Sequence, residues 1–286
     1  MKADLRSVTL CAVDCRTPAL AARALRLSAR SCDFADALLL SDQPFADPAF
    51  RTVLIPQLGT LDAYSRFVFQ ELAHHIHTPH VLIVQWDGYV LDAGAWQPEF
   101  LAHDYIGARW GHFGGAMTVG NGGFSLRSQR LLEATASGRL PWVPDAAEDV
   151  LVCRTYRQRL QDQWGIGYAP QDVADAFAYE ALDPEGPTFG FHGLYNLWRH
   201  VDDDEMLNLL AQLPPQALAG GPGVLLMERY LALRKFTLAR AIYDRLRLEH
   251  DEEQLFALML RHLPSRAQAQ ASLAWLQRLV ARAAGL

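Results

Sequence analysis

The segment QWDGY, residues 85–89, places an amide and a carboxylate at the end of the apolar run VLIVQW. Residues two apart in a β-strand point to the same side, so Gln85 and Asp87 project together while Trp86 points away. One carboxylate, with phosphate oxygens and water, can complete the shell of a Mg²⁺ ion. Asp87 could equally be a plain turn residue before Gly88. The pair is the first candidate for a ligand site.

A glycine-rich segment, VGNGGFSLRS at residues 119–128, is the second candidate. Its glycines, at positions 120, 122 and 123, allow backbone conformations and close approaches that a Cβ atom would obstruct. The lysine and the spacing of a phosphate-binding G-x-x-x-x-G-K-[ST] loop are missing. The pattern therefore predicts either a tight hairpin or a loop that passes close to another group.

Two further segments carry titratable side chains. Glu148 and Asp149 precede the apolar stretch VLVC, where a carboxylate can stabilise the start of a helix or take a proton from an acceptor hydroxyl. His192, in FGFHG, is either a core histidine or, if it lies near Asp87, a ligand for a metal or a diphosphate. The histidines at 74, 75, 77 and 80 lie at an expected helix end, where imidazoles favour the helix dipole.

The elements that position these residues alternate along the first hundred residues. Apolar runs predict strands at 8–13, 35–41 and 81–86, and helical periodicity predicts helices at 18–30 and 64–76. This order indicates a parallel sheet whose carboxyl edge would carry Asp87 and, after the first strand, Asp14. Residues 104–200 read as loops on this scaffold. Four apolar-periodic segments after residue 204 predict a helical cap, or a helix pair of the tetratricopeptide kind at 225–246.

The composition narrows the class of protein. The chain has 286 residues, 50% of them hydrophobic, and a net charge of -6, enough for one core with an appendage. An acidic balance argues against nucleic acid as a partner. No apolar stretch reaches the roughly 18 residues of a membrane span, so we expect a soluble, cytoplasmic protein. The spacing of the four cysteines favours reduced packing residues.

Taken together, the motifs QWDGYVL, HDYIGARW, VGNGGFSLRS, EDVLVC and FGFHG resemble a bacterial family of GT-A-like glycosyltransferases defined by a domain of unknown function. The resemblance covers about residues 5–200. It implies an α/β fold with a GT-A-like, mostly parallel sheet flanked by helices in residues 1–202, and an all-helical extension in residues 203–286. EDV is also similar to the base-bearing motif of β-1,3-galactosyltransferases and Fringe-type enzymes, which invert the anomeric centre.

The resemblance implies a role for each candidate residue. Asp87 takes the D-x-D position and, with His192, would hold Mn²⁺ or Mg²⁺; Gln85 departs from the motif and leaves metal dependence open. Asp149 or Glu148 would be the base. The other donor-binding candidates are Asp14 for the nucleoside, Asn121, Gly122, Gly123 and Phe124 for the sugar, and Arg109 or Arg127 for the diphosphate.

The function implied is inverting transfer of a sugar from a nucleotide-sugar donor, a UDP-sugar being favoured, to a hydroxyl of a glycan or glycoconjugate, as in polysaccharide biosynthesis. The alternative is an inactive nucleotide-sugar-binding or interaction protein with the same fold. QWDGY also resembles the D-x-D-G-T motif of haloacid-dehalogenase-like phosphatases, but Gln85 cannot replace their nucleophilic aspartate. The helical extension is a candidate surface for a protein partner.

Overall fold

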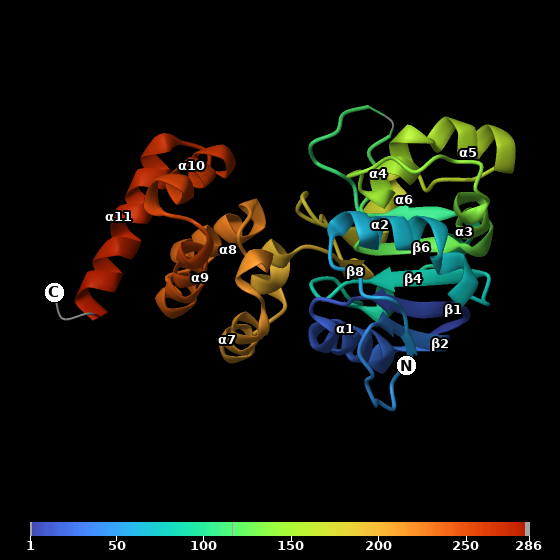
Figure 1. Cartoon of the computed structure of the whole chain (residues 1–286), viewed down its shortest axis with the longest axis horizontal. Coiled ribbons are helices and arrows are strands. Elements are labelled where there is room, and N and C mark those ends of the chain that lie inside the picture. Colours follow the sequence, from blue (N-terminus) through green and yellow to red (C-terminus); the bar gives the residue numbers. More distant parts are fainter. Residues whose placement is uncertain (1, 116, 284–286) are drawn as a thin grey trace. The chain divides into compact units, whose positions relative to one another are not determined.

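The computed structural model describes residues 2–115 and 117–283 (Figure 1). The chain forms two compact units, residues 1–192 and residues 193–286. The second unit begins before the boundary expected at residue 203, because the short helical segment Leu194–Arg199 (η5) belongs with the C-terminal helices. Each unit is described in turn.

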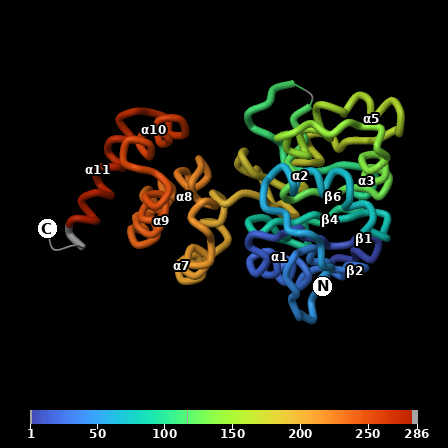
Figure 2. The backbone as a smooth tube through the Cα atoms, viewed as in Figure 1, coloured from blue at the N-terminus to red at the C-terminus, as the bar shows by residue number. Residues whose placement is uncertain are grey.

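The N-terminal unit is built on a six-stranded sheet in the order β3-β2-β1-β4-β6-β5. β1 to β4 run parallel, and β6 is antiparallel to both of its neighbours. In Figure 2, the tube of β6 lies beside that of β4 although nearly 40 residues separate them in the chain. The strands are β1 (Ala3–Val13), β2 (Cys32–Ser41), β3 (Arg51–Leu54), β4 (His80–Val84), β5 (Tyr105–Gly107) and β6 (Phe124–Ser128).

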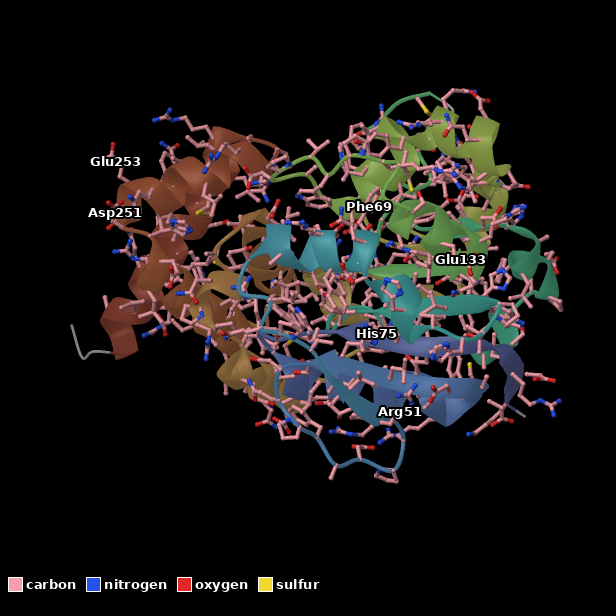
Figure 3. The ribbon with its side chains drawn as sticks, turned by 45° about the vertical axis from the view of Figure 1, so that its right-hand side comes forward. Arg51, Phe69, His75, Glu133, Asp251 and Glu253 are labelled. Atoms are coloured by element: carbon pink, nitrogen blue, oxygen red, sulfur yellow. The ribbon has the colours of Figure 1, made fainter. Side chains whose placement is uncertain are left out.

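Helices cover both faces of this sheet. Alternate residues of the central strands, such as Cys11, Leu38 and Ile83, form one core cluster with side chains from the second and third helices. The first helix joins β1 to β2, so the usual right-handed crossover puts it on the opposite face. Figure 3 labels Phe69, which contacts Trp142 from the second helix. The helices of this unit are α1 (Pro18–Ser31), α2 (Leu61–Gln70), α3 (Gln129–Ala136), α4 (Glu148–Val150), α5 (Arg157–Trp164) and α6 (Gln171–Phe177).

Local signals set the ends of several elements. Pro18 occupies the first turn of α1, where its missing N–H costs nothing. Thr60 caps α2 by accepting a hydrogen bond from the Ala63 amide, which is why this helix begins before the predicted residue 64. It also ends early, at Gln70, and a 3₁₀ turn, η1 (Leu72–His75), follows. Two further 3₁₀ turns are η2 (Ala93–Ala95) and η3 (Pro98–Ala102), and a π-helical turn follows α4 at η4 (Leu151–Thr155).

The C-terminal unit is helical. Its helices α8 and α9 span the segment 225–246, in which Tyr230, Ala239 and Tyr243 are buried. Asp251, labelled in Figure 3, caps α10 through a reciprocal pair of hydrogen bonds with Gln254. The helices are α7 (Asp203–Gln212), η6 (Pro215–Ala217), α8 (Gly221–Ala232), α9 (Phe236–Glu249), α10 (Glu252–His262) and α11 (Arg266–Ala283).

The expected α/β class is confirmed: a mostly parallel sheet is flanked by helices and is followed by a helical C-terminal region. All four cysteines are buried with free thiols. Within the described ranges, none of the helices combines the length and the apolar character needed to cross a membrane.

Candidate active site

The candidate site lies at the carboxyl edge of the sheet. β4 ends at Val84, and Val84 pairs with Phe124, the first residue of the antiparallel β6. The segment that leaves β4 at residues 85–88 therefore meets the segment that enters β6 at residues 121–123. A single bridge between Gln85 and Gly88 makes the turn after β4 compact. Two of the sequence motifs are thus brought together by the strand register alone.

His192 is the point at which the motifs meet. It directly follows β8 (Gly190–Phe191), which pairs with β7 (Ala178–Tyr179), and its amide donates to the Tyr179 carbonyl. On one side of the ring, Nε2 lies 3.1 Å from Gln85 Oε1 and 3.4 Å from Asp87 Oδ1. On the other side, Nδ1 lies 3.1 Å from Glu180 Oε1.

Electrostatics favour a positive charge on this ring. Burial by itself lowers the pKa of His192, but the charge of Asp87 and hydrogen bonds to Asp87 and Glu180 outweigh burial and raise the pKa to about 10. Asn121 Nδ2 also lies 3.1 Å from Nδ1. A protonated ring has no acceptor there, so the Asn121 amide would pair through Oδ1, the buried oxygen that otherwise lacks a hydrogen bond in the described residues.

The glycine pair of the second motif passes between two crowded groups. A Cβ atom on Gly123 would lie 2.1 Å from His192 Nε2, and one on Gly122 would lie 2.4 Å from Glu148 Oε1. Neither glycine has a positive φ, so the need for glycine is steric and not conformational. The residue before them, Asn121, does adopt φ 55°, which asparagine tolerates better than most residues. The motif is a loop of close approach, one of the two alternatives that its sequence left open.

The third motif separates into two roles. Glu148 is 4% exposed and accepts hydrogen bonds of 2.9 and 3.1 Å from both terminal nitrogens of Arg127, which is itself 2% exposed. Asp149 is half-buried at the start of α4, and its Oδ2 accepts a hydrogen bond of 2.9 Å from the Gly122 amide. Of the two carboxylates, Asp149 is therefore the one placed to meet a substrate, and Glu148 holds Arg127 in the core.

Four of the expected donor-binding residues make contacts within the fold. Arg127 is buried against Glu148 and so has no guanidinium face left for a diphosphate. Phe124 is fully buried and packs on Phe177. Arg109 pairs with Asp175 at 2.5 Å in a cavity of about 360 Å³ that Glu180 also lines.

Asp14, the fourth, follows β1 at the carboxyl edge, but its carboxylate is engaged locally. It accepts hydrogen bonds from the amides of Arg16 and Thr17 and from the Thr17 hydroxyl. This turn leads the chain into α1, so Asp14 has a local structural role that the sequence reading did not assign to it.

Two residues at the site were missed by sequence reasoning. Glu180 contacts His192, and the Tyr64 hydroxyl accepts a hydrogen bond of 2.9 Å from Gln85 Nε2. Tyr64 lies on α2 and Glu180 directly after β7, in segments whose apolar pattern predicts packing only. The contacts join residues 21 and 12 positions apart across the fold, and no local pattern reveals them.

A divalent cation fits this site in part. Over residues 2–115 and 117–283, no group of three or more His, Cys, Asp or Glu is arranged to hold a metal. The oxygens of Gln85 and Asp87 do approach the same ring nitrogen of His192, but a cation would have to displace the proton of that nitrogen before the imidazole could serve as a ligand beside them. Such a set suits a cation that completes its shell with oxygens of a bound diphosphate and water.

Comparisons with known proteins come from three directions. Among solved structures, the chain is similar to the apo form of the glycosyltransferase GlyE of Streptococcus pneumoniae TIGR4, with 12% sequence identity and a TM-score of 0.36. The similarity covers 71% of this chain and 55% of the GlyE chain, so this chain spans only about half of that protein. Curated protein sequences give no match.

The third comparison concerns a family of proteins. The family model described as "Protein of unknown function (DUF5672)" matches residues 50–192, half of the chain. The matched range contains Gln85, Asp87, the loop at 121–123 and Asp149, and it ends at His192. The chain belongs to the DUF5672 family.

Proposed function

We propose that this protein transfers a sugar from a nucleotide-sugar donor to a hydroxyl of a glycan or glycoconjugate, with inversion at the anomeric carbon. One observation carries the proposal: Gly122 contacts the carboxylate of Asp149, and the adjacent Gly123 packs against His192. Consecutive Cα atoms are about 3.8 Å apart. The half-buried carboxylate of Asp149 and the Asp87–His192 group therefore contact neighbouring residues of one short loop.

The Asp87–His192 side of the loop suits the donor diphosphate. Asp87 would hold a divalent cation there, with Gln85 as a weaker ligand, and His192 would join them on releasing the proton of Nε2. When bound, the cation supplies positive charge to the diphosphate as it leaves. The donor nucleotide is expected to be UDP from the family resemblance alone.

The Asp149 side of the loop suits the acceptor. The Gly122 amide holds one carboxylate oxygen of Asp149, which fixes the orientation of the group. In the reaction, Asp149 takes the proton of the acceptor hydroxyl as that oxygen attacks the anomeric carbon, and the bond to the diphosphate breaks with its electron pair. A general base on the face opposite the leaving group gives inversion.

The first test is a thermal-shift screen of UDP-, GDP-, CMP- and dTDP-sugars with and without Mn²⁺, followed by measurement of transfer and donor hydrolysis. Asp149→Asn should then lower transfer by roughly 10²–10⁴-fold and leave donor binding unchanged. Asp87→Asn should weaken donor binding as well.

Two outcomes would contradict the proposal. Normal transfer by Asp149→Asn would remove the base, and binding of a donor without transfer or hydrolysis would instead indicate a nucleotide-sugar-binding protein. Lys235→Met serves as the control variant, because its exposed ion pair with Asp203 lies in the C-terminal unit.

A further inference from the structure

A chain of buried hydrogen bonds runs from Glu148 to the glycine loop. The terminal nitrogens of Arg127 donate to Glu148, and its Nε donates to the Ser125 hydroxyl at 3.0 Å. That hydroxyl in turn donates to the Gly122 carbonyl at 3.0 Å. The ring of Tyr105, whose centroid lies 5.1 Å from Arg127 Cζ, packs against the guanidinium. Ser125 is fully buried, so little water competes for these bonds.

The same loop residue also contacts the candidate base. The Gly122 amide donates to Oδ2 of Asp149, and Asp149 directly follows Glu148 in the sequence. The contacts therefore close a ring, in which a covalent step joins the two carboxylate residues and hydrogen bonds join the rest. Gly122 takes part in this ring through its backbone on both sides, with its amide toward Asp149 and its carbonyl toward Ser125.

Gly122 depends on these contacts because it has no side chain of its own. A glycine has more conformational freedom to lose on folding than any other residue. A larger residue does not fit, since a Cβ atom at position 122 would lie 2.4 Å from Glu148 Oε1 and 2.9 Å from Arg127 Nη2. The direction of the Gly122 amide is therefore set by hydrogen bonds to groups outside the loop.

We infer that Ser125 and Arg127 are positioning residues for the carboxylate of Asp149. Ser125 holds the Gly122 carbonyl and Arg127 holds the Ser125 hydroxyl, so that the Gly122 amide stays directed at Asp149. The role of Asp149 as the base in this scheme rests on the proposed function. Glu148 takes part indirectly, because it holds the arginine whose Nε donates to the hydroxyl.

One hydroxyl can be removed without removing the buried ion pair. Ser125→Ala deletes the link between Arg127 and Gly122. Thr135→Val is the matched control, because the Thr135 hydroxyl is also buried and also donates to a carbonyl three positions earlier, that of Leu132 in α3. The comparison separates the place of the hydroxyl in the fold from its burial.

The first measurement needs no substrate. In ¹H–¹⁵N spectra of the full chain, the Gly122 amide proton should resonate downfield because it is bonded to a carboxylate, and Asp149→Asn, which offers only a neutral acceptor, should move it upfield. Ser125→Ala should also move this proton upfield, and Thr135→Val should leave it in place. An unchanged Gly122 resonance in Ser125→Ala would overturn the inference.

The second measurement compares donor binding with kcat for transfer. A displacement of roughly 1 Å at a reacting group can cost 10²-fold, so Ser125→Ala, which loosens the base without removing it, should lower kcat by about 10–100-fold. Donor binding should stay unchanged, and Thr135→Val should match the unmodified protein in both. In an Asp149→Asn background, Ser125→Ala should lower kcat no further, because the base on which it acts is already gone.

The outcomes distinguish this inference from the proposed function. A full further loss of kcat on adding Ser125→Ala to Asp149→Asn would overturn the positioning role. If Ser125→Ala shifted the Gly122 amide proton in a protein that transferred no sugar, the proposed function would fall and the positioning of Asp149 would be supported.

Discussion

A single methyl group at position 123 tests the geometry of the site most directly. In Gly123→Ala, the new Cβ would lie 2.1 Å from Nε2, 2.3 Å from Cδ2 and 2.5 Å from Cε1 of His192. Ordinary contacts begin at 3.4 Å, so the ring or the loop must move by about 1.3 Å. The ring cannot swing away freely, because Asp87, Gln85 and Glu180 hold it from both sides.

The expected cost has two parts. Forcing an extra methyl group into a packed region costs about 1–3 kcal/mol of stability, which the fold can tolerate. A displacement of this size at the reacting groups is expected to lower transfer about 10²-fold. Donor binding should fall too, because the displaced group is the one assigned to the diphosphate.

The assay compares urea unfolding, donor binding and transfer for Gly123→Ala and two other variants. Gly59→Ala is the control, since nothing lies within 4 Å of its Cβ position. Gly122→Ala would instead crowd Glu148 and Asp149, so it should lower transfer more than donor binding. If Gly123→Ala bound donor and transferred sugar as the unmodified protein does, the placement of His192 at the donor diphosphate would be refuted.

Three further changes have expected outcomes. Arg127→Met should lower the free energy of unfolding, measured with urea, by about 3–5 kcal/mol, because it leaves Glu148 buried without a partner. Arg240→Met, which breaks an exposed ion pair, should lower it by under about 1 kcal/mol. Equal losses in the two variants would contradict this ranking. Burial lowers the pKa of His80, so the unfolded chain takes up the proton first as the pH falls below about 6.5. Between pH 7.5 and 5.5 the unmodified protein should therefore lose more free energy of unfolding than His80→Gln does. Parallel curves of stability against pH for the two proteins would refute this. Chelation with EDTA should abolish transfer and added Mn²⁺ should restore it, whereas full activity in EDTA would assign the diphosphate to protein side chains alone.

Much of the scaffold could be predicted from the sequence. The apolar runs at 8–13 and 35–41 lie in the parallel strands β1 and β2, and the run predicted at 81–86 lies in β4 as far as Val84, because a strand buried on both faces needs a continuous apolar run. Pro18 and the helical spacing of the apolar residues after it predicted α1. β3 was not predicted, since a four-residue edge strand with the sequence RTVL is half-exposed and has no such run.

The candidate site was predicted less completely. Asp87 could be singled out as a carboxylate at the end of an apolar run, the loop at 121–123 by its glycines, and His192 as the titratable residue of FGFHG. Arg127 could not be placed, because β6 is buried on both faces and an arginine there depends on a carboxylate 21 positions away. Tyr64 and Glu180 could not be predicted for the same reason. Each contacts the site through a hydrogen bond to a residue distant in the chain, and the residues next to them in sequence do not indicate that bond.

The distance along the chain between Gln85 and His192 has a consequence during synthesis of the protein. The two residues are 107 positions apart, and His192 is the last residue of its unit. At roughly 5–20 residues per second, a ribosome needs about 5–20 s to make the stretch between them. Throughout that interval the nascent chain carries Asp87 and the end of β4 without the imidazole that will lie against them, and the order of synthesis delays completion of the site until the whole N-terminal unit has been made.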